Sequence, residues 1–256
     1  MNQGDDVTLR PVEQLRRLHG LSTVAWSHGG TLELDDAHWI SLSGARSADY
    51  NLALCHGPRG AEHIQASIDR MVSARQPAII AVAGEAKDAE ATFADSRWVR
   101  VGSAPLMVID TAIGRPDPDA RELTAEELPA ARALVEEVFD LTPEVAEVAL
   151  TVDANAVEGR SVWGLYDGDE LVSCLVAMYV EDAMVIWSMA TSPRGRRRGY
   201  GQRLLSSSLH AAHERGTEIG LLHASSDGEP FYLAAGYRIV ERWDFWSRPR
   251  WVLRAS

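Results

Sequence analysis

The hydrophobic pattern of the first 113 residues predicts alternating helices and strands. Apolar residues recur at helical spacing in three segments, and short apolar runs predict strands between them. The predicted helices cover residues 11–18, 60–74 and 85–94, and the predicted strands cover residues 39–42, 50–54, 78–82, 98–101 and 106–109. Pro77 separates the second helix from the strand after it, because proline has no N–H group to continue a helix. This order predicts a mixed α/β layer.

The second half of the chain begins with two capped helices. Thr124 to Glu127 has the capping-box pattern, and Thr142-Pro143-Glu144 is a typical helix start. Apolar runs then predict strands at 162–166, 171–180, 184–190 and 219–224, and two more within 238–246. The sequence Asp167-Gly168-Asp169 is typical of a hairpin turn. A helix ending near Gly216 connects strands 184–190 and 219–224, so we expect these two strands to be parallel.

A polar, proline-containing stretch separates the two halves. Gly114 to Asp119 contains two prolines, which cannot pair inside a sheet and suit a linker. We therefore predict an N-terminal α/β domain at 1–113, a linker at 114–120 and a C-terminal domain at 121–256.

A basic, glycine-rich turn follows the predicted strand 184–190. It runs Arg196-Arg197-Arg198-Gly199-Tyr200-Gly201 and leads into the next helix. A helix start carries free backbone N–H groups and a partial positive charge, so it is prepared to hold phosphate. Gly199 and Gly201 lack a Cβ atom and let the backbone approach an anion closely. The turn predicts a phosphate site with arginines as countercharge.

Composition narrows the classes of partner. The net charge of −12 opposes binding to nucleic acid or anionic lipid and weakly favours a cationic partner. The two cysteines, Cys55 and Cys174, suggest neither a disulfide framework nor a metal site. Residues 1–6 lack the features of a signal peptide, and no apolar run reaches the length of a membrane span. We expect a cytoplasmic protein without a bound metal.

Two motifs in the second half resemble those of the GNAT superfamily of acyl-CoA-dependent N-acyltransferases. Residues 196–201 fit the pattern Arg/Gln-x-x-Gly-x-Gly/Ala, and residues 231–237 resemble the second signature of that family. The resemblance covers about residues 121–246. It implies the GNAT fold, a mixed and mostly antiparallel sheet flanked by helices, with the pantetheine arm in a splay between strands 184–190 and 219–224. The first half faintly resembles an eroded copy, as in tandem GNAT proteins; the alternative is an unrelated domain that covers the substrate or forms a dimer.

The resemblance also implies roles for individual residues. The backbone around Met189 and Ala190 would contact the acyl carbonyl and the pantetheine amides, and Thr191 would continue that contact. The pyrophosphate would be held by Arg196, Arg197, Arg198, Gly199, Tyr200 and Gly201. Tyr232 matches the position of the acid that protonates the departing thiolate, although it could instead be a packing residue.

The function expected from this resemblance is acetyl transfer from acetyl-CoA to a primary amine, directly within a ternary complex. The acceptor would be a small molecule or peptide, and its identity, the acyl preference and the oligomeric state, including a homodimer, stay open. A non-catalytic acyl-CoA sensor is the alternative. No general base is assigned, because strand 184–190 offers only Ser188 as a polar side chain, and a lone strand histidine such as His223 is more often structural.

Overall fold

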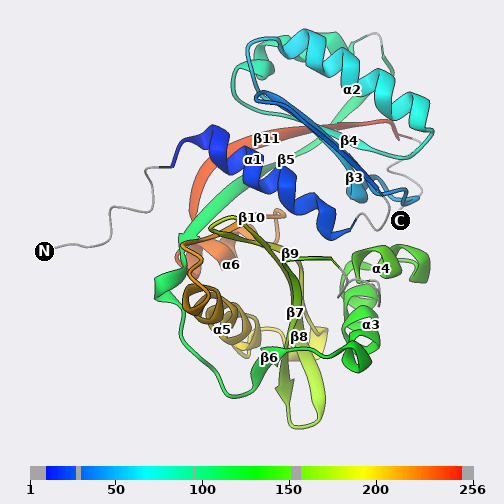
Figure 1. The fold of residues 1–256 in the computed structure, drawn as a ribbon. Helices are drawn as coiled ribbons and strands as arrows, with labels where there is room; N and C mark the ends of the chain where they lie inside the picture. The colour runs from blue at the N-terminus through cyan, green and yellow to red at the C-terminus, as the bar shows by residue number, and fades with distance from the viewer. Residues whose placement is uncertain (1–9, 27–29, 95, 151–156, 250–256) are drawn as a thin grey trace, which may run out of the picture.

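One mixed sheet of eleven strands organises the described part of the chain (Figure 1). The computed structural model describes residues 10–26, 30–94, 96–150 and 157–249; the acidic N-terminal residues lie outside this description. The strand order is β1-β2-β3-β4-β11-β5-β10-β9-β8-β7-β6. The strands are β1 Thr31–Leu34, β2 His38–Leu42, β3 Asn51–Cys55, β4 Ile79–Val82, β5 Val99–Asp110, β6 Ala120–Glu122, β7 Arg160–Asp167, β8 Glu170–Val180, β9 Ala183–Thr191, β10 Ile219–His223 and β11 Arg238–Ser247.

In the C-terminal half, helices cover both faces of the sheet, as Figure 1 shows. Helices α3 (Leu128–Phe139) and α4 (Pro143–Ala149) pack on one face, and α5 (Tyr200–Glu214) packs on the other, followed by the short helix α6 (Glu229–Ala234). The predicted capping box at Thr124 is present, and Thr142 is the N-cap of α4. Strands β9 and β10 are parallel, as the helical crossover predicts.

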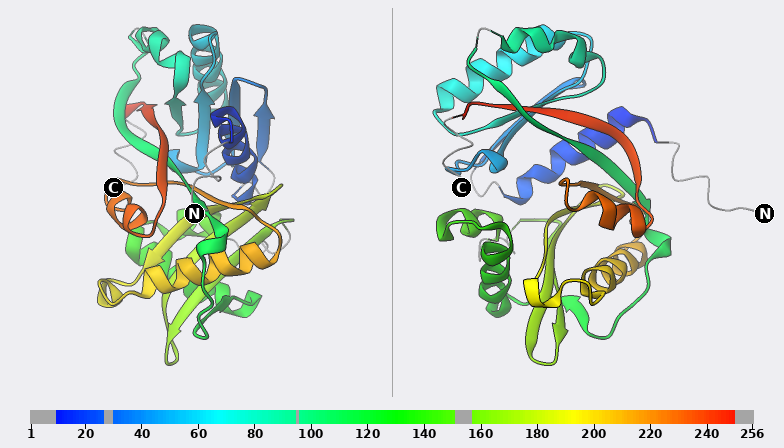
Figure 2. Two further views of the ribbon diagram at one scale, coloured as in Figure 1. Left: turned by 90° about the vertical axis from the view of Figure 1, so that its left-hand side faces the viewer. Right: turned by 180° about the vertical axis from the view of Figure 1, so that it is seen from behind.

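The described part of the N-terminal half contains β1 to β4, the helices α1 and α2, and several 3-10 helices. Helix α2 (Gly60–Ala74) has the predicted bounds, whereas α1 (Val12–Ser22) extends four residues beyond the predicted end at Leu18. The helix predicted near Glu85 is instead the 3-10 helix η4 (Gly84–Phe93). Helix α1 lies between the two halves of the molecule (Figure 2), so its apolar face can contact both.

Strands β5 and β11 join the two halves. β5 belongs to the first half in sequence but pairs with β10, and β11 belongs to the second half but pairs with β4; the two strands also pair with each other. The prediction of two strands in each of these segments was wrong. Gly102 and Pro105 interrupt the apolar pattern of β5 without breaking the strand, and two register irregularities interrupt that of β11.

The strand order repeats across the middle of the sheet. β1, β2, β3 and β4 have the pairing directions of β7, β8, β9 and β10, while β11 and β5 exchange places. In this correspondence the crossover β3–α2–β4 matches β9–α5–β10. The first half therefore repeats the connectivity of the second, and its origin as an eroded copy stays a prediction.

The predicted linker is held against the C-terminal half. The Arg115 N–H group donates to the Ser206 carbonyl at 3.1 Å, and Asp117 accepts two hydrogen bonds from the Arg203 guanidinium. Ala120, the last residue of the predicted linker, begins the edge strand β6. The sheet continues across the predicted boundary, and the division into two domains stays a prediction.

Candidate functional site

Strands β9 and β10 separate halfway along their length. Their parallel pairing runs only from Ala183 to Val185 on β9 and from Ile219 to Leu221 on β10. β9 continues to Thr191 and β10 to His223, so one edge of each strand faces the gap without a strand partner. Residues 187–189 are half-buried although they lie in the middle of the sheet. This splay leaves backbone groups of β9 available to hydrogen-bond a ligand that lies between the strands.

A bulge in β9 sets the direction of its side chains at the splay. The register to β8 shifts between Cys174 and Val176, and Ser188 opposite has a φ of 47°. Ile186 and Met189 pack toward α5, whereas Trp187 and Ser188, although consecutive, both contact the N-terminal half. Both faces of the splay therefore carry side chains of β9.

The basic turn lies at the start of α5, beside the open end of β9. The first hydrogen bond of the helix runs from the Arg203 N–H to the Gly199 carbonyl at 3.0 Å. The N–H groups of residues 200–202 come before that bond and lack a helical acceptor. Together with the helix dipole they form the environment that an anion prefers.

The two glycines of the turn meet different requirements. Gly199 has a φ of 83°, a conformation that side chains disfavour, and a Cβ there would meet no atom within 4 Å. Gly201 faces the splay: a Cβ there would lie 3.1 Å from Thr191 Oγ1 and 3.4 Å from Met189 Cε. A larger residue at position 201 would fill the junction between the turn and β9.

The arginines of the turn differ in their contacts. Arg198 lies 3.7 Å from Asp167 and over the ring of Tyr200. Within the described part of the chain, Arg196 and Arg197 form no hydrogen bond or ion pair, and both are exposed. These two guanidinium groups are available to a diphosphate. The Tyr200 side chain is buried and donates to Asp167, so only the backbone of this residue faces the turn.

Neighbouring side chains fix the end of β9. The Ser173 hydroxyl donates to the Ala190 carbonyl at 2.8 Å and lies 2.9 Å from Thr191 Oγ1. Ser173 was not predicted as a site residue, because it lies within the otherwise apolar strand β8. It is a positioning residue for the two predicted site residues it contacts.

Tyr232 reaches the splay from α6. Its hydroxyl donates to the Met189 sulfur at 3.5 Å, and its ring contacts Phe231 and Tyr237. Burial raises the pKa of Tyr232 above its ordinary value. The phenol therefore stays protonated at neutral pH, as an acid at this position must. The structure thus brings the turn, residues 189–191 and Tyr232 together around one gap.

The matching crossover in the N-terminal half has no such gap. β3 and β4 pair from Leu52 to the strand end at Cys55, and the Ala83 N–H then donates to the Cys55 carbonyl at 3.0 Å. The start of α2 is also covered, since a Cβ on Gly60 would lie 2.7 Å from Ala86 Cα. Of the two repeated crossovers in the described residues, β9–α5–β10 is the one whose strands separate before their ends.

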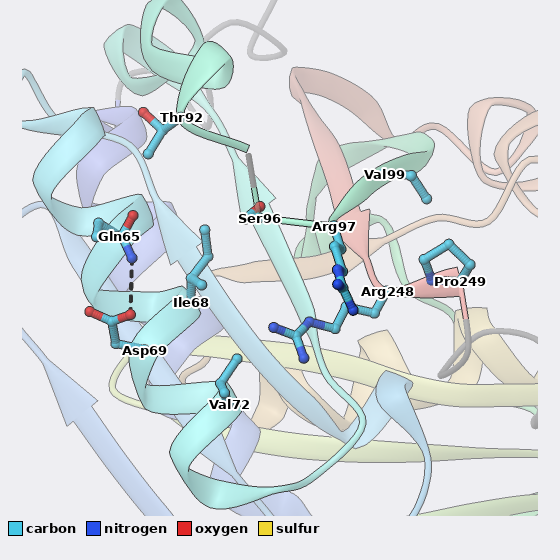
Figure 3. Close-up of a pocket in the computed structure, with 10 residues that line it drawn as sticks. All are labelled: Gln65, Ile68, Asp69, Val72, Thr92, Ser96, Arg97, Val99, Arg248 and Pro249. Carbon is cyan, nitrogen blue, oxygen red and sulfur yellow. Dashed lines mark hydrogen bonds between the residues drawn. The ribbon is translucent and has the colours of Figure 1, made fainter. Parts of the chain in front are cut away.

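A separate hollow of about 860 Å³ lies in the N-terminal half, beside α2 (Figure 3). Its lining includes Gln65 and Asp69, which hydrogen-bond each other at 2.9 Å, and Arg97. No lining residue belongs to the turn or the splay. Among the described residues no cluster of three or more histidine, cysteine or acidic side chains could hold a metal, and no described helix has both the length and the apolar character needed to cross a bilayer.

Comparisons with known proteins agree with this geometry. A family model described as an acetyltransferase (GNAT) domain matches residues 119–240. No curated protein matches the sequence significantly. A solved structure of a GCN5-related N-acetyltransferase from Kribbella flavida superposes with a TM-score of 0.70 at 12% identity, over 94% of this chain and 96% of that one.

Two further solved structures extend over both halves. A tandem GNAT protein from the clavulanic acid biosynthesis pathway has a TM-score of 0.56 at 13% identity, with 96% of each chain covered. A putative GNAT acetyltransferase from Novosphingobium aromaticivorans has a TM-score of 0.55 at 15% identity, covering 90% of this chain and 99% of that one. Residues 119–240 therefore match the GNAT acetyltransferase domain, and the chain as a whole has the fold of these GNAT structures.

Proposed function

We propose that the protein transfers an acetyl group from acetyl-CoA to a primary amine, directly within a ternary complex. The observation that carries the proposal is the splay between β9 and β10 next to the open start of α5. A cofactor with a diphosphate and a long amide-containing arm needs both an anion site and an unpaired strand edge. The cytoplasm is the proposed compartment, and both cysteines are free and buried, which fits it.

The residues present fit acyl-CoA. The N–H groups at the start of α5, with Arg196 and Arg197, would hold the diphosphate, and the free edge of β9 at residues 189–191 would pair with the pantetheine amides. A backbone N–H of this edge would also stabilise negative charge on the acyl oxygen. The bound cofactor supplies an activated thioester. Tyr232 would give its proton to the sulfur as the carbon–sulfur bond breaks.

The test is acceptor-dependent release of CoA. Purified protein with acetyl-CoA is offered benzylamine, spermidine, glucosamine and a tetrapeptide with a free amino terminus, and free thiol is followed with a chromogenic reagent. We expect release with at least one amine and the acetylated amine by mass spectrometry. Tight acetyl-CoA binding without release by any amine would favour the alternative, a non-catalytic acyl-CoA sensor. No binding of acetyl-CoA would contradict both.

A further inference from the structure

Three buried histidine nitrogens lack hydrogen-bond partners at one place in the molecule. They are Nδ1 and Nε2 of His19 and Nε2 of His223. His19 is only 1% exposed. A buried polar atom without a partner costs roughly 1–3 kcal/mol. Native structures explain such atoms by an ordered water, a ligand or a catalytic role. Three in one cluster therefore point to a polar group or water that binds at these rings.

The two imidazoles lie directly at the splay. His223 is the last residue of β10, and its ring is 5.8 Å from that of His19, centroid to centroid. The His19 ring, carried by α1 of the N-terminal half, is 4.7 Å from that of Trp187 on β9. His19 thus contacts the separated ends of both strands, on the face opposite α5.

The surroundings keep both rings neutral. Burial lowers the pKa of His223 to about 3, and burial and the nearby His223 lower that of His19 well below its ordinary value. The neighbouring carboxylate, Glu241 of β11, is already bound by Arg16 of α1 at 2.6 Å and by the Trp243 indole N–H at 2.7 Å. β9 and residues 101–109 of β5 contain no ionisable side chain. A neutral imidazole has a free lone pair on one nitrogen, which a proton acceptor requires. The same burial weakens this lone pair as a base, so it can accept a proton only from an N–H that becomes acidic as the carbon–nitrogen bond forms.

We propose that His223 accepts the proton of the acceptor amine and that His19 is a positioning residue that holds this imidazole at the splay. The proposal rests on the proposed acetyl transfer and names the base that the sequence left unassigned. It also gives the N-terminal half a role in the reaction, because α1 supplies one of the two rings.

The protons balance with two residues on opposite faces of the splay. As the bond between the amine nitrogen and the acyl carbon forms, the nitrogen loses a proton to Nε2 of His223. As the carbon–sulfur bond breaks, Tyr232 gives its proton to the sulfur. The imidazolium and the phenolate are then returned to their neutral forms by exchange with water. The products are an amide and a thiol.

The test compares three variants of the full chain with the panel amine that gives the fastest CoA release. For His223→Gln we expect kcat to fall by roughly 100-fold or more, with the acetyl-CoA Kd and the acceptor KM within about threefold of wild type. For His19→Asn we expect kcat to fall by about tenfold, again with the acetyl-CoA Kd and the acceptor KM within about threefold of wild type. Phe245→Leu is the matched control, since its ring packs 5.1 Å from His223 but carries no proton; its kcat should stay within threefold.

The outcomes distinguish the proposed role of His223 from the proposed acetyl transfer itself. Acceptor-dependent release in wild type with an unchanged kcat in His223→Gln overturns the role of His223 and leaves the acetyl transfer intact. Equal losses in His223→Gln and Phe245→Leu assign the cluster to packing. If His223→Gln does not fold, His223→Asn and a high-resolution structure of wild type with CoA take its place. There Nε2 should bind an ordered water or amine in the splay, and a ring without either contradicts the proposal.

Discussion

Replacing Gly201 by glutamate should remove most of the affinity for acetyl-CoA. A Cβ at this position already lies 3.1 Å from Thr191 Oγ1 and 3.6 Å from Phe231 Cζ, so the longer side chain must turn toward the anion site. A carboxylate within about 6 Å of a phosphate repels it by roughly 3 kcal/mol at an effective dielectric constant of about 20. Since about 1.4 kcal/mol corresponds to a tenfold change, we expect the Kd to rise roughly 100-fold.

Isothermal titration calorimetry with CoA measures this loss, beside two comparison variants. Gly201→Ala adds a contact that a shift of a few tenths of an ångström relieves, so its Kd should change by less than tenfold. Gly102→Glu introduces the same charge on β5, where a Cβ meets no atom within 4 Å, and should bind CoA as wild type does. A Gly201→Glu protein that keeps its melting temperature and binds CoA with a Kd within threefold of wild type would refute the assignment of the turn.

Three further predictions concern the acid, the number of cofactor sites and a helix cap. Tyr232→Phe should lower kcat roughly 100-fold with the CoA Kd within twofold of wild type, and undiminished turnover would show that the residue only packs. Because burial raises the pKa of this phenol, wild type should lose no activity through ionisation of Tyr232 up to pH 9. Calorimetry should give one CoA per chain, since β3 and β4 stay paired to their ends; two sites would contradict this. Glu127→Gln keeps a capping-box residue but removes the ion pair with Arg121, and should lower the free energy of unfolding by roughly 0.5 kcal/mol at pH 7, measured with urea. Arg121 holds the pKa of this carboxyl well below its ordinary value, so the stabilisation is present above the unfolded pKa near 4.3 and should disappear as the pH falls below it.

The C-terminal half could be predicted closely because its signals are local. The capping box at Thr124, the Thr142 cap, the hairpin turn and the glycine-rich turn each act within a few residues. The parallel pairing of β9 and β10 follows from a helical crossover. Local pattern and fold agree there, so the sequence predicts most of the elements and brings the candidate site residues to one end of β9.

The N-terminal half and the join between the halves could not be predicted in the same way. The partners of β5 and β11 depend on tertiary packing. No local pattern indicates that β5 pairs with β10 of the second half or that β11 pairs with β4 of the first. The elements of the crossover β3–α2–β4 were predicted, but its correspondence to β9–α5–β10 was not, because its turn lacks the glycine spacing and arginine cluster of the second half. His19 gave no signal either, since one histidine on an apolar helix face is typical of a packing residue.

A crystal structure of the complex with CoA tests the central claim most directly. We expect the diphosphate oxygens within 3.2 Å of backbone N–H groups at residues 197–202, and the pantetheine arm hydrogen-bonded to the free edge of β9 between β9 and β10. A diphosphate bound away from this turn, or an arm that does not enter the splay, would contradict it.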